Sequence, residues 1–407
     1  MSSMNSSLLS ENTALEIADL PRMLYVGDAS IEAGFGGSLL IYRLLQGYQA
    51  ERLLIFDSSL HPSRPSGRLP GVTYQPIYLG PQRVVRSRYS ARFFSLLTLL
   101  IEPLILQMSR AMRRFKPAAI LTVAHGFEWM LAHRLAVRYG LPLHILIHDD
   151  WQATHNLQGI SARIAASRFR TAYRQARSRL CISPYMAERY QQHYGSPAQV
   201  LYPLRDAATR SANLARRVDE QGKRPVTFAY AGSVHFSAYA DTLTMLACAL
   251  EAAGGRLVVY SPEYNTLSAR AELRKAHVWL RPAVPPNEIG GVLRREADVL
   301  FVPMSFDPIH RLNMEMAFPS KLADYTATGL PLFIFGPPYC SAVRWAQENP
   351  GVAAVVSDID EESMRQVVGR LVTEASYRQQ LAHEASRVGD ALFAHPVVSQ
   401  QFFRALV

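Results

Sequence analysis

Ionisable side chains follow two of the apolar runs in this chain. His125 comes directly after one run, and His148, Asp149 and Asp150 come directly after another. If these runs are strands of an open α/β sheet, the side chains lie at the carboxyl edge, where such sheets bind ligands. A histidine there can bind a hydroxyl or transfer a proton, and a carboxylate can act as a base. A surface histidine and a helix-capping aspartate are the plainer alternatives.

A glycine-bearing loop follows the first apolar run, Met23–Val26. It contains Gly34, Gly36 and Gly37 and leads into a predicted helix that starts at Ser38. Glycines let a backbone approach a ligand closely, and a helix N-terminus presents free N–H groups to an anion. The spacing is not the full dinucleotide fingerprint, so a tight turn without a ligand stays an equal alternative.

The most informative segment runs Pro319-Ser320-Lys321 and continues to Asp324. The proline and serine stand where a helix should start, and the lysine adds a full positive charge beside free backbone N–H groups. Asp324 lies one turn further along on the same face, where it can accept hydrogen bonds from ribose hydroxyls. The pattern is therefore compatible with a diphosphate and ribose site. An ordinary capped helix with an exposed lysine fits the spacing equally well.

Short apolar runs alternate with helix-like stretches from about residue 22 to residue 357. Such alternation is typical of parallel strands covered by helices. The runs form two series, which predict an α/β protein with two doubly wound, Rossmann-like domains. The first series comprises Met23–Val26, Leu53–Phe56, Ile120–Val123, His144–Ile147, Leu180–Ile182 and Val200–Tyr202, and the second comprises Thr227–Ala231, Leu257–Tyr260, Val278–Leu280, Val299–Val302 and Leu332–Phe335.

A polar stretch separates the two series. Residues 204–225 are rich in Arg, Asp and Gly and lack an apolar period, which is typical of a linker. The predicted divisions are an N-terminal tail at 1–20, a Rossmann-like domain at 21–203, a linker at 204–225, a second Rossmann-like domain at 226–390 and a C-terminal segment at 391–407 that packs back on the first domain.

The composition is that of a globular protein with acidic partners. The 407 residues are 49% hydrophobic, and 43 Lys+Arg against 33 Asp+Glu give a net charge of +10. These fractions leave little room for disorder, and the length exceeds what one core usually organises. Cys181, Cys248 and Cys340 are too few for a disulfide framework or a zinc site, and the sequence starts without a secretory pattern. We therefore expect a cytoplasmic protein.

The longest apolar stretch, Phe93–Met108, has basic flanks. It contains Glu102 and Pro103 and falls short of the roughly 20 apolar residues of a spanning helix. We predict a helix that is partly core, with a basic rim that docks peripherally on anionic lipid at the inner face of the plasma membrane. A core helix with solvated arginines is the alternative. The flanking basic residues are Arg83, Arg86, Arg88, Arg92, Arg110, Arg113, Arg114 and Lys116.

The run from Pro319 to Pro331, PSKLADYTATGLP, resembles the donor-binding segment of GT-B glycosyltransferases. Further segments follow in the order found in glycosyltransferase family 4, also called group 1, so that the resemblance covers about residues 22–390. These segments are Gly36-Gly37, His125, Leu146–Asp150, Cys181–Gly195, Phe228–Val234 and Ala297–Pro303. The resemblance implies a GT-B fold, in which an N-terminal acceptor domain and a C-terminal nucleotide-sugar donor domain face each other across a cleft.

The resemblance also implies an activity. It predicts a glycosyltransferase of the hexosyltransferase type, which moves a sugar from a UDP- or GDP-sugar to a glycan or lipid-linked acceptor in bacterial surface polysaccharide or glycoconjugate synthesis. No Asp-x-Asp motif stands where a metal-dependent enzyme of this kind needs it, so we expect metal independence. We also expect no cofactor besides the nucleotide-sugar co-substrate, and no nucleic-acid partner. A nucleotide-sugar epimerase, a sugar phosphorylase and a non-catalytic nucleotide-sugar-binding subunit stay open as alternatives.

The resemblance suggests a role for each candidate residue. Catalysis is assigned to His125, near the transferred sugar, and to Asp149, which orients or deprotonates the acceptor. His148 and Asp150 are assigned to acceptor binding. The residues assigned to the donor are Gly36, Gly37, Gly232, Ser233, Pro319, Ser320 and Lys321 around the diphosphate, Asp324 at the ribose and Arg281 near the base.

Three positions depart from the family 4 pattern. The first glutamate of the usual Glu-x7-Glu pair falls on Met316, with Glu315 as a neighbouring substitute. Ser233 and Tyr239 stand where many members carry an arginine and a lysine for the diphosphate, and Lys321 can replace that charge. Nucleotide-sugar binding stays the expectation. Retention or inversion of the sugar's configuration is left open.

Overall fold

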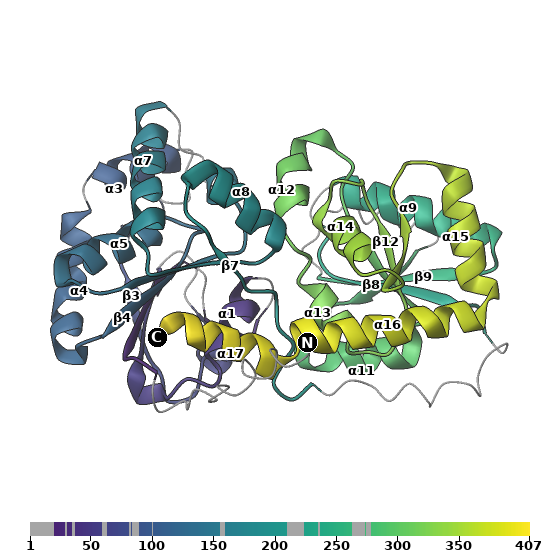
Figure 1. Ribbon diagram of the computed structural model, residues 1–407, viewed down its shortest axis with the longest axis horizontal. Coiled ribbons are helices and arrows are strands. Elements are labelled where there is room, and N and C mark those ends of the chain that lie inside the picture. The colour runs from purple at the N-terminus through teal and green to yellow at the C-terminus, as the bar shows by residue number, and fades with distance from the viewer. Residues whose placement is uncertain are drawn as a thin grey trace, which may run out of the picture.

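The computed structural model describes residues 20–28, 31–34, 37–58, 63–80, 83, 89–99, 101–154, 159–209, 224–234, 237–262, 273 and 278–407. Four predicted features lie outside these residues: the tail up to residue 19, Gly36 of the glycine loop, the arginines Arg86 and Arg88, and residues 210–223 of the linker. The described residues form two α/β halves that lie side by side (Figure 1).

Seven parallel strands form the N-terminal sheet, in the order β3-β2-β1-β4-β5-β6-β7. The strands are β1 (Met23–Gly27), β2 (Leu53–Ser58), β3 (Thr73–Ile77), β4 (Ala119–Val123), β5 (Leu143–Ile147), β6 (Ser178–Cys181) and β7 (Gln199–Val200). The helices of this half are α1 (Gly37–Leu45), α3 (Ser90–Leu99), α4 (Glu102–Phe115), α5 (Glu128–Tyr139), α6 (Trp151–Thr154), α7 (Gly159–Gln175) and α8 (Pro184–Tyr194).

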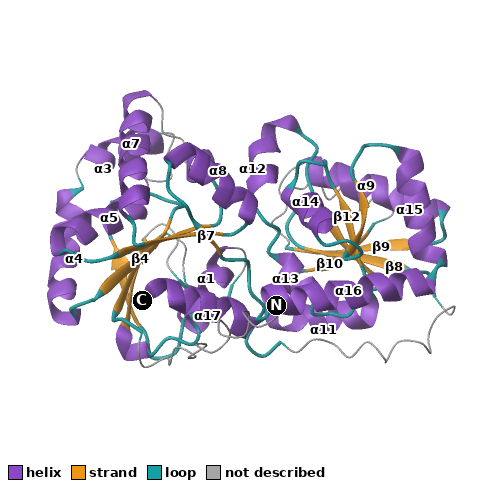
Figure 2. Cartoon of the chain, in the orientation of Figure 1, coloured by secondary structure: helices purple, strands orange, loops and turns teal. Residues whose placement is uncertain are grey.

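Six parallel strands form the C-terminal sheet, in the order β10-β9-β8-β11-β12-β13. The strands are β8 (Thr227–Ala231), β9 (Arg256–Ser261), β10 (Trp279–Pro282), β11 (Val299–Pro303), β12 (Leu332–Phe335) and β13 (Ala353–Val356). The helices are α9 (Ser237–Ala252), α11 (Pro286–Glu296), α12 (Arg311–Met316), α13 (Lys321–Tyr325), α14 (Ser341–Glu348) and α15 (Glu361–Thr373). Helices flank both sheets (Figure 2), so the predicted pair of doubly wound α/β domains is confirmed.

Burial explains which strands the sequence revealed. Every residue of β1, β4 and β5 is buried, because helices cover both faces of a parallel sheet, and such strands read as continuous apolar runs. The strands β3 and β13 were not predicted. Both are edge strands with exposed or half-buried positions, and β3 reads TYQPI, with no apolar run to mark it.

The chain crosses between the two halves twice. The first crossing follows β7, where the ring of Tyr202 packs against Phe318 at 5.1 Å and Phe393 at 5.5 Å between centroids. The second crossing joins α16 (Ala375–Phe393) to α17 (His395–Leu406). Figure 1 shows these two helices in yellow, running one after the other, with the last described residues over the N-terminal half. There Phe403 packs against Tyr48 of the loop after α1, with centroids 6.2 Å apart.

A buried arginine fixes the first crossing to the C-terminal half. Arg205 is 3% exposed. Its Nε donates to the Ala323 carbonyl at 3.0 Å, its Nη2 donates to Thr326 Oγ1 at 3.0 Å, and its Nη1 donates to the Asp390 carboxylate. These bonds hold α13 and α16 on the crossing segment. A missing partner would leave a buried guanidinium unpaired, which is costly.

The apolar stretch Phe93–Met108 is not one helix, which corrects the prediction. It is divided between α3 and α4, because Pro103 occupies the first turn of α4, where its missing N–H is tolerated. One face of α4 is buried, whereas Leu106 and Arg110 are exposed. Among the described residues no single helix has the length and apolarity to cross a bilayer, and the pair Arg92–Thr98 and α4 meets those criteria only when joined across a 61° bend.

Two helical glycines give a test of the Arg205 anchor. A Cβ on Gly389 of α16 would lie 2.3 Å from Arg205 Nη2 and 2.3 Å from Thr326 Oγ1, whereas a Cβ on Gly369 of α15 would meet no atom within 4 Å. Gly389→Ala is therefore expected to lower the free energy of unfolding by about 1–3 kcal/mol. Gly369→Ala should raise it by about 0.5–1 kcal/mol, because alanine favours the helix.

Urea unfolding followed by circular dichroism measures both variants against the wild type. Equal midpoints for Gly389→Ala and Gly369→Ala would contradict the tight contact at Arg205.

Candidate functional site

A cavity of about 430 Å³ opens at the carboxyl ends of β8, β9, β10 and β11. Its lining includes Gly232 after β8, Pro262 after β9, Ala283 after β10 and Met304 after β11. Leu39 of α1 lines it from the N-terminal half. The cavity therefore lies where open α/β sheets bind ligands, with one wall supplied by the other domain. We call it the donor cavity, after the segment that resembles a donor site.

Lys321 is the one cation among the described residues that line the donor cavity. Its ammonium lies 5.1 Å from the centroid of the Tyr230 ring. Burial lowers the pKa of Lys321 below its ordinary value. Within the described part of the chain no carboxylate forms an ion pair with this ammonium. The carboxylate that lines the same cavity, Asp324, pairs with Arg43 instead.

Neighbouring residues of the donor segment hold Lys321 in place. Tyr325, one turn further along α13, accepts a hydrogen bond from the Ala231 N–H at 2.8 Å through its hydroxyl. That bond ties α13 to the end of β8. A Cβ on Gly232 would lie 2.8 Å from Lys321 Nζ, so only a glycine leaves room for the ammonium there. Tyr230 donates to the Ser233 carbonyl at 2.8 Å and so fixes the turn that follows β8.

The structure brings most of the predicted donor residues to this cavity. Gly232, Ser233, Ser320 and Lys321 line it, together with Pro319 and Asp324. Ser320 precedes α13 without capping it, so its exposed hydroxyl does not serve the helix.

Two residues considered in the sequence, Arg281 and Glu315, lie outside the donor cavity. Arg281 is exposed on β10 and is not among the lining residues, whereas Ala283 and Val284, just after this strand, are. Glu315 forms an ion pair with Arg311 at 2.8 Å and does not line the donor cavity. It therefore does not substitute there for the missing first glutamate.

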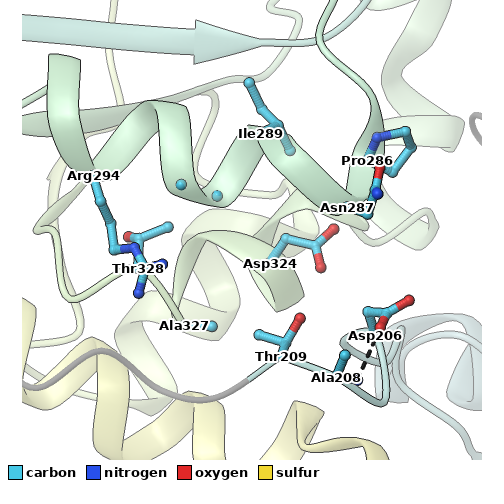
Figure 3. A pocket seen from close by; sticks show the side chains of 12 residues that line it. Asp206, Ala208, Thr209, Pro286, Asn287, Ile289, Arg294, Asp324, Ala327 and Thr328 are labelled. Atoms are coloured by element: carbon cyan, nitrogen blue, oxygen red, sulfur yellow. Dashed lines mark hydrogen bonds between the residues drawn. The ribbon is translucent and has the colours of Figure 1, made fainter.

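Asp324 joins the donor cavity to a second cavity of about 320 Å³. Figure 3 shows its side chain projecting between α11, with Asn287, and the crossing segment, with Thr209. The Asp324 carboxylate also accepts from Arg43 Nη1 of α1, at 3.0 Å to Oδ1 and 3.2 Å to Oδ2. Burial raises the pKa of Asp324 above its ordinary value, and the positive charge of Arg43 acts against that rise.

A second cluster lies at the carboxyl ends of β1, β4 and β5, which are neighbours in the N-terminal sheet. Asp28 Oδ2 lies 2.7 Å from His125 Nδ1. The His125 and His148 rings stack with centroids 5.6 Å apart and an angle of 13° between their planes. His148 Nε2 lies 3.3 Å from Asp149 Oδ2. Four polar side chains from three strands therefore form one row, which we call the histidine cluster.

The protonation states of the two histidines are driven apart. The hydrogen bond with Asp28 raises the pKa of His125, while burial lowers the pKa of His148. Burial acts to raise the pKa of Asp28, but the hydrogen bond with His125, the charge of His125 and the backbone N–H of Gly126 together lower it. His125 is therefore the member of the stacked pair that carries a proton more readily.

Two carboxylates at this site were not predicted from the sequence: Asp28 of the histidine cluster and Glu128 beside it. Asp28 follows β1 directly, which is the same signal that identified His125 after β4, but it was not assigned a role. Glu128 in the first turn of α5 is 1% exposed. Burial and the nearby Asp28 carboxylate raise its pKa to about 8. A Cβ on Gly126 would lie 2.4 Å from an oxygen of each carboxylate, so both converge on this glycine.

Asp150 does not join the histidine cluster. Its Oδ1 accepts from the Tyr190 hydroxyl at 3.1 Å, and burial raises its pKa.

His125, His148 and Asp149 have the side-chain types for a metal site, and their ligand atoms lie within 4.8 Å of one another. His148 Nε2 and Asp149 Oδ2 are 3.3 Å apart, close to the roughly 3.4 Å between two ligands of a tetrahedral zinc ion. The two stacked histidine rings turn their faces toward each other. The cluster therefore has the side chains for a metal ion as well as for hydrogen bonding.

Helix α1 contacts both candidate sites. A Cβ on Gly37 would lie 2.8 Å from His148 Nε2, so the helix starts directly against the histidine cluster. Leu39 lines the donor cavity, and Arg43, one turn further along the helix, donates a hydrogen bond to the Asp324 carboxylate. One helix of the N-terminal half therefore contacts the histidine cluster, the cavity and the ribose candidate in turn.

The family model described as Glycosyltransferase Family 4 matches residues 36–209. Among solved structures, Alr3699/HepE from Anabaena, in complex with UDP and glucose, superposes with a TM-score of 0.68 at 12% identity, over 94% of this chain and 98% of that one. Sucrose-phosphate synthase from Thermosynechococcus elongatus gives 0.64 at 13% identity, over 94% of this chain and 97% of that one. No curated protein sequence matches the chain.

A third solved structure is WaaG, a glycosyltransferase involved in lipopolysaccharide biosynthesis, with a TM-score of 0.59 at 13% identity over 94% of this chain and 99% of that one. At such low identity the structural likenesses establish the fold alone. The family match is a separate finding, and it covers most of the N-terminal half. The chain therefore has the two-domain GT-B glycosyltransferase fold, as the sequence resemblance implied, and its residues 36–209 match the Glycosyltransferase Family 4 model.

Proposed function

We propose that the protein transfers a sugar from a nucleotide-sugar donor to an acceptor hydroxyl. The observation that carries this proposal is Lys321, a largely enclosed ammonium without a carboxylate partner among the described residues, inside a cavity of about 430 Å³. A charge that is partly withdrawn from water is stabilised by a counter-charge, and a diphosphate supplies one. The cavity volume lies within the about 300–1,000 Å³ common for small-molecule sites.

The proposed reaction depends on stabilising a leaving group. As the bond between the sugar and the diphosphate breaks, negative charge grows on the diphosphate, and a fixed cation beside it lowers the barrier. Lys321 is placed to do this beside the turn Gly232–Ser233. Asp324 accepts from the ribose hydroxyls. Because Lys321 supplies the charge, we expect transfer without a divalent ion, and a chelator should leave the rate unchanged.

The histidine cluster is the proposed acceptor side. The bond with Asp28 orients His125 through Nδ1, which leaves Nε2 as the second polar atom of the ring. His125 then contacts the transferred sugar, and Asp149 orients or deprotonates the acceptor hydroxyl. Its side chain is 42% exposed, so it is accessible to an acceptor.

The comparisons make particular substrates the first to test. Alr3699/HepE has been solved with UDP and glucose, and WaaG is described as involved in lipopolysaccharide biosynthesis. We therefore propose a UDP-hexose as donor, and a glycan or lipid-linked acceptor of surface polysaccharide synthesis. Labelled donor incubated with and without acceptor pools tests this. Transfer supports the proposal, whereas epimerised donor or bound but unreacted donor would favour the epimerase or the non-catalytic subunit.

Removal of the Lys321 charge tests the diphosphate assignment. Lys321→Ala is expected to weaken binding of UDP by about 1.5–3 kcal/mol, or roughly 10- to 100-fold, because the charged contact to the phosphates is lost. Isothermal titration calorimetry measures this. Arg365→Ala is the matched control, since it removes one positive charge from an exposed pair with Glu362 in the same domain. Unchanged affinity in Lys321→Ala would refute the assignment.

Substitution of Asp28 tests the protonation of His125. The bond with Asp28 raises the pKa of His125, so Asp28→Asn should lower that pKa. If transfer uses the neutral imidazole, the rate rises with pH through this pKa, and in Asp28→Asn that rise moves to lower pH. Histidine NMR titration and the pH–rate profile measure the shift. The exposed control Asp358→Asn should leave both unchanged, and an unmoved His125 pKa in Asp28→Asn would contradict the pairing.

Vesicle flotation tests peripheral membrane docking. The exposed arginines of α4, Arg110, Arg113 and Arg114, support docking on anionic lipid at about 1 kcal/mol per basic residue. The protein should float with phosphatidylglycerol vesicles at low salt and less at high salt. Reversal of the three charges to glutamate should abolish flotation, whereas reversal of Arg365, Arg370 and Arg387 should not. If the protein stays unbound at low salt, the docking proposal is wrong, and the acceptor does not lie at an anionic membrane surface.

A further inference from the structure

The carboxylate assigned to the ribose already has a partner from the other domain. Arg43 of α1 and Asp324 of α13 are separated by 281 positions, yet one guanidinium nitrogen lies 3.0 and 3.2 Å from the two carboxylate oxygens. The same nitrogen donates to the Leu204 carbonyl of the crossing segment at 2.9 Å. The pair therefore joins three segments: the first helix, the crossing between the domains and the donor helix.

The pair is enclosed on the arginine side and open on the carboxylate side. The Arg43 side chain is 5% exposed, whereas that of Asp324 is 27% exposed and lines both cavities. A carboxylate accepts at about four lone-pair positions, and Arg43 occupies one on each oxygen. The remaining positions face the cavities. Asp324 can thus accept from Arg43 and from ribose hydroxyls at the same time.

Arg43 also favours the charged form of Asp324. Burial favours the neutral carboxyl group, and Arg43 is the strongest of the charges that oppose this. Arg205 acts in the same direction, and Asp206 acts against it. A neutral carboxyl group would use one oxygen as a donor and would accept ribose hydroxyls less well.

We propose that Arg43 is a positioning residue, which makes ribose recognition by Asp324 depend on contact between the two domains. This inference rests on the proposed function. Asp324 lies in the C-terminal domain, but the guanidinium group that orients its carboxylate lies in the N-terminal domain. The nucleoside site is therefore complete only when the domains are in contact. A donor bound through its ribose in turn favours the arrangement in which acceptor and donor sites face each other.

The experiment compares UDP with 2′-deoxy-UDP by isothermal titration calorimetry, with GDP and 2′-deoxy-GDP as a second pair. The wild type is expected to prefer UDP roughly tenfold, as for one hydrogen bond to a charged group. Arg43→Gln should reduce this preference to about one while leaving the affinity for 2′-deoxy-UDP unchanged. Arg43→Lys should restore part of the preference, because it keeps the charge. A purely structural defect would instead weaken both nucleotides equally.

Two further variants complete the design. Asp324→Asn should lose the ribose preference as Arg43→Gln does, and Arg52→Gln is the matched control, since Arg52 donates to the Leu20 carbonyl within the N-terminal half. If Arg43→Gln does not fold, Arg43→Lys still tests the proposal, because its expected preference is intermediate. A preference that survives in Arg43→Gln, or that is absent from a wild type that binds UDP, overturns this inference and leaves the proposed function standing. A wild type that binds neither UDP nor GDP overturns both.

Discussion

The five-residue helix α13 is held between the two domains by two buried arginines, and the geometry of the donor cavity depends on that constraint. Arg205 binds the carbonyl of Ala323 and the hydroxyl of Thr326, and Arg43 binds the carboxylate of Asp324. A helix this short is not stable alone, so tertiary contacts must fix it. The two guanidinium groups supply directional bonds where a short helix has few of its own.

The distribution of charge along α13 follows from these anchors. The Asp324 carboxylate forms an ion pair with Arg43 of the N-terminal half. Lys321, one turn earlier, lines the cavity without a carboxylate partner among the described residues. An anionic group that enters the cavity therefore meets a positive charge, and a hydroxyl-bearing group one turn away meets an oriented acceptor. This sequence of charges matches a diphosphate joined to a ribose, and it is produced by five residues of one segment.

Both candidate sites share a topological origin. The donor cavity lies at the carboxyl ends of β8 to β11, and the histidine cluster lies at the carboxyl ends of β1, β4 and β5. In each sheet, neighbouring parallel strands bring residues from distant parts of the chain to one edge. Helix α1 then spans the gap, with Gly37 against His148 and Arg43 against Asp324. The two sites are thus connected through one rigid element.

The sequence by itself determined the two-domain α/β fold, because strands buried on both faces must be apolar throughout, and β1, β4 and β5 read that way. Helix-start chemistry and the resemblance also singled out the segment around Lys321, which lines the donor cavity. The sequence did not reveal the edge strand β3, which is half exposed, or the break at Pro103, since local pattern does not fix where an apolar stretch bends. The roles of Asp28 and Arg43 were decided only by the tertiary structure. Asp28 meets His125 because β1 and β4 are neighbours, and Arg43 reaches Asp324 only once the domains are packed together, which no local periodicity encodes.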